Sequence, residues 1–599
     1  MAIKKFQNFN WWLNLAESAG IEDNELAIAK NVFYNNSQQL QTRRWYRKFG
    51  NPIGSNPITS YFFRQHDSTQ ERFAICVAGT DMYKYNETTE NRTSFVDTLT
   101  EFEQQVMTIT NRSRWDFAVY KNVAYMGNGV DPYTSYDGTT FSYLWLGTLT
   151  TCTFDNTTEY VNKTTHWLAT NDTVVFVETS GTLPAEVIEY TVYTITRIDN
   201  DNFTLSTSEG GSVLGFTDNG SGTLQFQKLT QPRLRYIQYL GDRLYGAGDD
   251  NNPSTLYYTD ATPTTGINIS QNAVVIGGDE QGVINGLNQY GQIVLAFKSD
   301  KIYSVNVAGS SVDAIDSQTW WYADRTIKSV GNTLAYFNER GIDTLTKRSG
   351  VGWTNGIESK PLSDNVRTLT ELVKEKQYNA GASQYIKTLN NYYFSFDTDN
   401  DNRPDTTLVY SSLVGAWTEY NYPTLYDYGQ YLNEDNEQQY LFSSASGGQM
   451  YQQEYGFDDD GQAIDIEVQT KDFDFDDPAQ LKMFRFVDVT GYKQEGGDVD
   501  IKILVDWVVE SLWSITDSNI SLNAPYWSLG LDALGEEVLW SRSEGSILLY
   551  PFTVRLRLYE RGANIAVNLS SSGVQWIMDK MRIDVEGEVI PVFGYNNII

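Results

Sequence analysis

The chain is 599 residues long and carries a formal charge of −32 at pH 7, from 44 Lys and Arg against 76 Asp and Glu. This length exceeds one compact core and predicts several domains or one large repeat architecture. The 40% hydrophobic content excludes an intrinsically disordered chain. Such an acidic surface argues against a protein that binds nucleic acid, because phosphate binding relies on Lys and Arg. A protein along which DNA slides without binding remains compatible with this charge.

Residues 1–60 are predicted to form a short helix followed by an arm. Asp23 suits the N-cap of a helix over residues 24–33, where Leu26 and Ala29 share one face. The N-terminus has no long apolar core or cleavage site, and no apolar run approaches the roughly 20 residues of a membrane span. We therefore expect synthesis in the cytoplasm and no membrane insertion.

A basic, aromatic cluster follows this helix. In a chain of this charge, it is more typical of a surface that receives an acidic partner or subunit than of a phosphate site, since Arg and aromatic residues concentrate in interfaces. Lys48 adds a further charge. The predicted interface residues are Arg43, Arg44, Trp45, Tyr46 and Arg47.

From residue 61 onward, alternating strands rich in Tyr and Phe end in Gly, Asn or Asp turns. The later units recur about 45–55 residues apart, the length of a four-stranded propeller blade. We predict an all-β chain whose β-propeller occupies residues 61–148 and 228–456. A set of unrelated β-sandwiches is the alternative.

Two segments interrupt or follow these repeats. The Thr-rich segment 149–227 is predicted to be an inserted small β-domain, and residues 363–376 a short helix capped by Ser363. Long alternating strands after Asp458–Asp460, which we expect to form an exposed linker turn, predict a C-terminal β-sandwich over residues 457–599.

Groups for catalysis are scarce. The two histidines, His66 and His166, lie in different predicted domains without a motif around them, and the two cysteines, Cys76 and Cys152, lack metal-ligand spacing. We expect buried thiols, structural histidines and no enzyme. A glycosidase would need two carboxylates across a cleft, and no pair stands out.

An acidic loop is the sharpest local motif. In the stretch DTDNDNRPD, carboxylates alternate between two predicted strands, and such loops can supply several oxygens to Ca²⁺. The loop lacks the Gly and closing Glu of an EF-hand, so a solvated hairpin loop is the alternative, and no other cofactor is expected. The candidate ligands are Asp397, Asp399, Asp401 and Asp405.

The N-terminal stretch resembles the opening of bacteriophage short-tail nozzle proteins, which are tail tubular protein B-like. The later runs 330–345, 405–420 and 447–475 resemble these proteins as well, so that the similarity covers most of the chain except the insert. Trp45 stands where that family usually has a glycine. The matching N-terminal positions are Leu13, Asn14, Ile21, Asp23, Asn24, Glu25, Asn31, Arg43 and Arg44.

The resemblance implies a virion structural protein of the viral tail. It implies a hexameric ring of propellers below an adaptor, with tail fibres or spikes attached at its side, through which genomic DNA passes without specific binding during ejection. A receptor-binding or glycan-degrading tail protein is the alternative function, and a cellular propeller that binds partners is a third.

Overall fold

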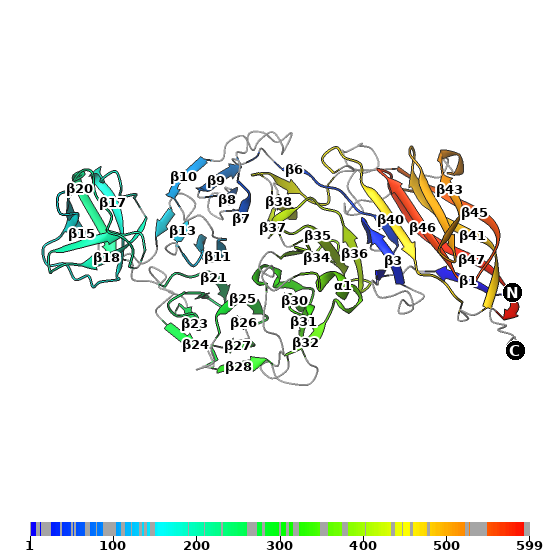
Figure 1. Cartoon of the computed structure of the whole chain (residues 1–599), viewed down its shortest axis with the longest axis horizontal. Coiled ribbons are helices and arrows are strands. Elements are labelled where there is room, and N and C mark those ends of the chain that lie inside the picture. Colours follow the sequence, from blue (N-terminus) through cyan, green and yellow to red (C-terminus); the bar gives the residue numbers. More distant parts are fainter. Residues whose placement is uncertain are drawn as a thin grey trace, which may run out of the picture. The chain divides into compact units, whose positions relative to one another are not determined.

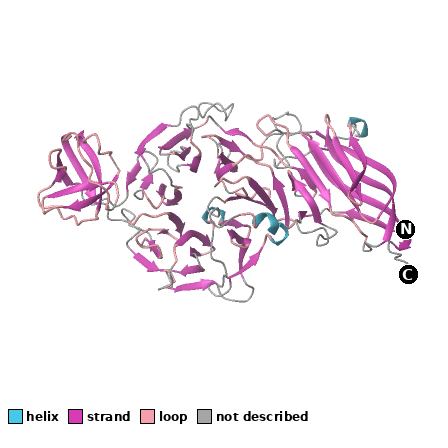
Figure 2. Cartoon of the chain, in the orientation of Figure 1, coloured by secondary structure: helices cyan, strands magenta, loops and turns pink. Residues whose placement is uncertain are grey.

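The computed structural model confirms the prediction of an all-β chain: the described residues form strands β1–β47, with one short α-helix and short 3-10 helices as the helical elements (Figure 2). The chain divides into two compact units, residues 52–322 with 351–355, and residues 1–51, 323–350 and 356–599. The structure describes residues 2–7, 12–13, 25–35, 39–49, 52, 56–65, 72–79, 81–87, 103–108, 114–120, 122–130, 134–136, 141–143, 150–189, 191–208, 210–228, 232–259, 272–277, 282–298, 301–306, 311–315, 323–347, 357–373, 381–399, 401, 403–432, 438–445, 447–455, 459–475, 480–520, 526–527 and 548–591.

The unit built on residues 52–322 contains four antiparallel four-stranded sheets in chain order. Each is a meander of neighbouring antiparallel strands, and two-residue turns that contain Gly241 and Gly291 connect β21 to β22 and β25 to β26. The sheets are β7 (Ile58–Gln65), β8 (Arg72–Ala78), β9 (Asp81–Glu87) and β10 (Glu103–Thr108); β11 (Asp116–Tyr120), β12 (Val123–Gly127), β13 (Thr134–Tyr136) and β14 (Phe141–Tyr143); β21 (Tyr236–Leu240), β22 (Arg243–Ala247), β23 (Thr255–Tyr258) and β24 (Asn272–Val275); and β25 (Ile284–Tyr290), β26 (Ile293–Lys298), β27 (Ile302–Asn306) and β28 (Ser311–Ile315).

Consecutive sheets of this unit pack face to face. Ile75 of the first sheet and Met126 of the second share one buried cluster. Leu244 joins the second sheet to the third, and Tyr245 and Val294 join the third to the fourth. The second and third sheets therefore bury both of their faces against neighbouring sheets, which removes their large aromatic side chains from water.

A closed six-stranded barrel lies between the second and third of these sheets in the chain (Figure 1). It has its own core, with Phe154, Phe176 and Phe226 fully or nearly fully buried. Closure leaves no unpaired sheet edge in it. The strands are β15 (Thr150–Asp155), β16 (Tyr160–Asn162), β17 (Thr173–Thr182), β18 (Val192–Arg197), β19 (Asn202–Ser206) and β20 (Ser221–Lys228).

The second unit contains two further four-stranded sheets and, between them in the chain, the four-stranded meander β33–β36, which is part of a ten-stranded sheet. The last of them takes its fourth strand, β6 (Arg47–Phe49), from the N-terminal segment, which pairs with β39. The other strands are β29 (Lys328–Val330), β30 (Thr333–Asn338), β31 (Gly341–Lys347) and β32 (Ile357–Pro361); β33 (Ala382–Ile386), β34 (Asn391–Phe396), β35 (Thr406–Ser411) and β36 (Ala416–Tyr420); and β37 (Leu425–Leu432), β38 (Gln438–Ser444) and β39 (Met450–Gln452).

Two sheets of long strands complete this unit (Figure 1). One continues from β36 through the N-terminal strand β3 into β40, β46, β42 and β43. The other joins the N-terminal strands β1, β4 and β5 to β47, β41, β45 and β44. Val487, Ile501 and Leu569 contribute to a continuous core between them. The strands are β1 (Ala2–Gln7), β2 (Trp12–Leu13), β3 (Glu25–Lys30), β4 (Val32–Tyr34), β5 (Leu40–Thr42), β40 (Asp465–Thr470), β41 (Gln480–Gln494), β42 (Val499–Val505), β43 (Val508–Ile515), β44 (Tyr526–Trp527), β45 (Leu548–Gly562), β46 (Ile565–Ser572) and β47 (Trp576–Pro591).

The predicted helix over residues 24–33 is wrong. Residues 25–30 form β3, whose backbone bonds β36 on one side and β40 on the other, and Asn31 (φ 56°) turns the chain into β4. Leu26 and Ala29 are fully buried, as the helical pattern required, but they are buried in a sheet. A short apolar run fits the repeat of a helix and that of a strand, and the strands available for pairing decide which of the two forms.

The second predicted helix is shorter than residues 363–376. A 3-10 turn (Asp364–Val366) leads into α1 (Arg367–Thr370), and Ser363 is not its side-chain cap. The Ser363 hydroxyl instead accepts a hydrogen bond from the amide of Ile342. Among the described residues, no helix has the length and apolar character to cross a membrane.

Candidate functional site

The acidic loop connects β34 to β35 and brings three of its four predicted ligands together. Carboxylate oxygens of Asp397, Asp399 and Asp405 all lie within 4.8 Å of one another. Asp397 is fully buried, Asp405 is half-buried and Asp399 is exposed. Oxygens that share one Ca²⁺ at about 2.3–2.6 Å lie at most about 5 Å apart, so this spacing fits a common ion.

Asp401, the fourth candidate, does not join this group. Its amide donates to Asp399 Oδ1 (3.1 Å), and its own carboxylate accepts from the amide of Arg403 (2.8 Å). Asp405 also accepts from the amide and hydroxyl of Thr398 (3.1 and 2.8 Å), which fixes the orientation of this carboxylate. The Ca²⁺ site therefore stays a prediction, with three carboxylates as ligands.

The predicted interface residue Arg43 lies inside the fold. Its side chain is fully buried and makes a bidentate ion pair with Asp459, and its Nε donates to Asn31 Oδ1 at 2.8 Å. The guanidinium also lies over the rings of Tyr420 and Tyr422, 5.5 and 5.1 Å from their centroids. A buried guanidinium needs this many partners, because an unpaired buried charge is very costly.

The neighbouring residues also face the protein. Trp45 is buried in the core of the second unit. Tyr46 packs edge-on against Phe442 and Tyr451, with ring centroids 5.3 and 5.2 Å apart. Arg47 lies over the ring of Tyr455, 3.3 Å from its centroid.

The prediction that this cluster anchors a partner is therefore wrong for Arg43 and Trp45. Arg44, like Tyr46 and Arg47, is half-buried. Sequence reasoning recognised hot-spot residue types but could not tell an external partner from the chain's own last sheet. Asp459 belongs to the turn predicted as an exposed linker, and it is buried; Asp458 lies outside the described residues.

A half-buried acid, Glu454, lies near Arg43 and Arg44, and its Oε2 atom is buried. No pattern in the sequence indicated Glu454. It has φ 56° and accepts a hydrogen bond from the Tyr393 hydroxyl at 2.6 Å. Burial raises the pKa of the Glu454 carboxyl above its ordinary range, and the nearby arginines Arg43 and Arg44 oppose this. Burial likewise raises the pKa of Tyr393.

The cysteines and the described histidine are structural. Cys76 and Cys152 are buried free thiols, and burial raises the pKa of Cys152 to about 12. His166 is buried with Nε2 3.1 Å from the carbonyl of Asn202 and its ring against Phe203. His66 lies outside the described residues.

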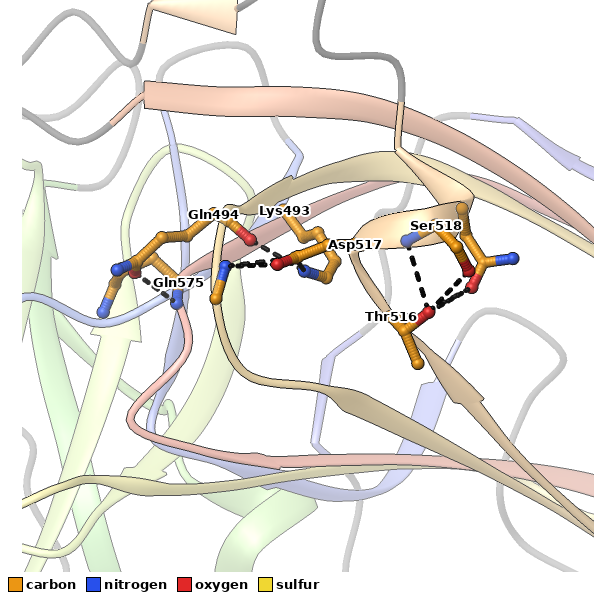
Figure 3. A network of polar contacts seen from close by, with 8 residues as sticks. Lys493, Gln494, Thr516, Asp517, Ser518 and Gln575 are labelled. Atoms are coloured by element: carbon orange, nitrogen blue, oxygen red, sulfur yellow. Dashed lines mark hydrogen bonds and ion pairs between the residues drawn. The ribbon is translucent and has the colours of Figure 1, made fainter.

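A second feature missed from the sequence is the β42–β43 hairpin, which a polar network holds at its base (Figure 3). Lys493 is fully buried, and its ammonium donates to Asp517 Oδ1 and to the carbonyl of Gln494, both at 2.8 Å. Asp517 also accepts from the amide of Gly496 at 3.0 Å. Asp517 begins the 3-10 turn after β43, so this network fixes where β43 ends.

No protein-family model and no curated protein matches the chain. Among solved structures, Chaetomium thermophilum Raptor is similar with a TM-score of 0.33 and 9% identity, over 69% of this chain and 29% of that chain. This chain therefore spans less than a third of the length of Raptor. A similarity this low carries no argument about fold or function.

Proposed function

We propose that this chain is a bacteriophage virion protein that forms the tail nozzle. In this role, a ring of copies continues the DNA-ejection channel below the adaptor and anchors the tail fibres. The proposal rests on the resemblance of the N-terminal segment to nozzle proteins and on the succession of four-stranded sheets, which suits a rigid wall better than a catalytic cleft. We accordingly propose a structural protein and not an enzyme.

The observation that carries the proposal is the pairing of β6 with β39. Along the described chain, six four-stranded sheets and the four-stranded meander β33–β36 of the ten-stranded sheet follow one another. The strand that completes the last of these seven meanders, β6, is the one that leads into the first through residues 50–57. A segment of this length spans at most about 30 Å. Residues 316–322 likewise connect the fourth sheet to the next unit. We propose that these seven four-stranded meanders are blades of one β-propeller, because closing the ring buries the faces of the terminal blades.

The charge of the chain suits a conduit. Genomic DNA moving through a channel would be retained by a stripe of Lys and Arg, since each phosphate contact releases counterions and adds affinity. An acidic wall repels phosphate and leaves the DNA free to slide. We expect the surface that faces the channel to be net negative, and a continuous basic stripe along it would contradict the proposal.

The test is the position of this chain in the particle. We expect an antibody against the chain to label the lower tail tube in negative-stain images of the virion, and cryo-electron microscopy of the isolated tail to show a six-fold ring of propellers. Label on fibre tips would instead support the receptor-binding or glycan-degrading alternative. Absence of the chain from the virion would overturn both.

A further inference from the structure

Glu454 lies where three parts of the second unit meet. It follows β39, and the next residue, Tyr455, donates its amide to the carbonyl of Trp45 in the N-terminal segment at 3.0 Å. The Tyr393 hydroxyl, in β34, donates to Glu454 Oε1 at 2.6 Å. Soon after Trp45 the chain enters β6, which pairs with β39. One acidic residue therefore connects the β33–β36 meander to the segment that leads into β6.

Glu454 borders a cluster of three buried tyrosines. The ring centroid of Tyr393 lies 5.7 Å from that of Tyr420 and 6.5 Å from that of Tyr422. Burial, and after it the charge of Glu454, raise the pKa of each of these phenols. The three phenols are therefore neutral at physiological pH, and they offer hydroxyl groups but no charge to the carboxyl group.

The nearby arginines do not bind Glu454. Arg43 is held in its bidentate ion pair with Asp459. Within the described part of the chain, neither Arg43 nor Arg44 forms an ion pair with Glu454. The titratable and charged groups around the Glu454 carboxyl group are Tyr393 of β34, Tyr420 of β36, Tyr422 after it, Arg43 and Arg44 of the N-terminal segment, and Asp459.

One oxygen of the Glu454 carboxyl group has no partner. Among the described residues, none donates a hydrogen bond to Oε2, which is buried, and the buried Tyr422 hydroxyl is unpaired as well. An ionised carboxylate with a single hydrogen bond does not recover the solvation that it loses on burial. A protonated carboxyl group needs only one acceptor for its O–H, and a phenol oxygen is such an acceptor. The site therefore suits the neutral acid better than the carboxylate.

The backbone of Glu454 is strained. Its φ of 56° lies in the left-handed region, which a residue with a Cβ atom keeps only while its surroundings hold it there. The hydrogen bond from Tyr393 holds the side chain, and the hydrogen bond from Tyr455 to Trp45 holds the backbone that follows. A change in the charge of Glu454 therefore acts on a segment that is ready to relax.

We propose that Glu454 is a proton-controlled switch for the N-terminal strand: the protonated carboxyl group keeps β6 paired with β39, and ionisation makes this pairing open more often. An ionised Glu454 must be hydrated, because a buried carboxylate is stable only with additional hydrogen bonds. Hydration separates Glu454 from Tyr393 and loosens the contact of Tyr455 with Trp45. The inference concerns the single chain and holds whether or not copies of it form a ring.

The direction of the pH dependence follows from the pKa of Glu454. Burial raises this pKa above its ordinary value of 4.5, and the hydrogen bond from Tyr393 and the charges of Arg44 and Arg43 oppose the rise. In the open state the carboxyl group is in water and has its ordinary pKa. The stabilisation of the β6 pairing is therefore fully present below about pH 4.5 and is lost as pH rises through the pKa of the paired state.

The test is hydrogen exchange of the full-length protein between pH 4.5 and pH 8, with each rate corrected for the intrinsic exchange rate at that pH. The amides of residues 47–49 and 450–452 report the pairing of β6 with β39, and those of the barrel β15–β20 serve as the reference. In the wild type, protection of the β6 and β39 amides should fall about tenfold over this range, which corresponds to one pKa unit. In Glu454→Gln, whose amide resembles the neutral acid, protection should stay at its acid value throughout.

Two further variants make the test specific. Glu419→Gln is the matched control, because Glu419 on β36 is also half-buried, burial also raises its pKa, and it lies 3.9 Å from Lys30. This variant should keep the pH dependence of the wild type. Tyr393→Phe removes the hydroxyl that favours the ionised form, so the fall in protection should extend to higher pH.

Each contrary outcome is distinct from failure of the nozzle proposal. Protection that is independent of pH in the wild type overturns the switch. A pH dependence that persists in Glu454→Gln, or disappears in Glu419→Gln, overturns it as well, since another group would then carry the effect. A Glu454→Gln variant that is unprotected at every pH, or that fails to fold, also overturns it, because the neutral side chain should hold this segment. The nozzle proposal depends instead on where the chain lies in the virion.

Discussion

Replacing Asp459 with Asn should release β6 from its sheet. The substitution leaves the Arg43 guanidinium fully buried with a neutral amide in place of the carboxylate that binds both of its terminal nitrogens. Breaking a buried ion pair from one side costs about 3–5 kcal/mol. At about 1.4 kcal/mol for each tenfold change, local opening becomes about 10²-fold to about 4 × 10³-fold more frequent.

Hydrogen exchange is the suitable assay, because a chain with several compact units need not unfold in one step. The amides of residues 47–49 and of 450–452, which pair β6 with β39, should lose protection by that factor at pH 7, while the barrel β15–β20 is unchanged. Lys48→Met is the matched control, since its pair with Asp460 is largely exposed and such pairs contribute little.

A double substitution separates charge burial from loss of shape. Arg43→Met combined with Asp459→Leu removes both charges and should recover most of the protection, because apolar replacements of buried pairs are often neutral or stabilising. Unchanged protection in the single Asp459→Asn variant would refute the reasoning that this pair holds the N-terminal strand in place.

Three further results are expected. Millimolar Ca²⁺ should raise the melting temperature by several degrees; Asp405→Asn should abolish the shift and Asp401→Asn should preserve it, and an equal response of both variants would argue against the site. Because burial raises the pKa of Glu454, the stability gained by its protonation is fully present below the unfolded pKa of about 4.5 and is lost as pH rises through the folded pKa. Glu454→Gln should therefore stabilise the protein in urea at pH 7 and change little at pH 4, and destabilisation at pH 7 would contradict this. With a pKa of about 12, the Cys152 thiol should not react with a thiol reagent at pH 8 until the barrel unfolds, and rapid native labelling would show the burial to be wrong.

The distance between two residues in the sequence decided whether their contact could be predicted. Asp397, Asp399 and Asp405 lie within nine positions of one another on a hairpin, so a local turn suffices to gather their carboxylates. Arg43 and Asp459 are more than 400 positions apart, and no local pattern relates them. Their pairing follows from which sheet the N-terminal strand joins.

The sequence by itself determined the all-β class, through alternating aromatic residues and glycine turns, because side-chain alternation and turn geometry act over a few residues. Only the tertiary structure decided that residues 25–30 extend as β3, that β6 completes the sheet of β39, and that Trp507 and Leu512 remain exposed. Each of these outcomes depends on which surfaces meet across hundreds of residues. An apolar or basic side chain of one type can lie in a core, in a buried ion pair or on an exposed surface, and what the fold places against it decides which.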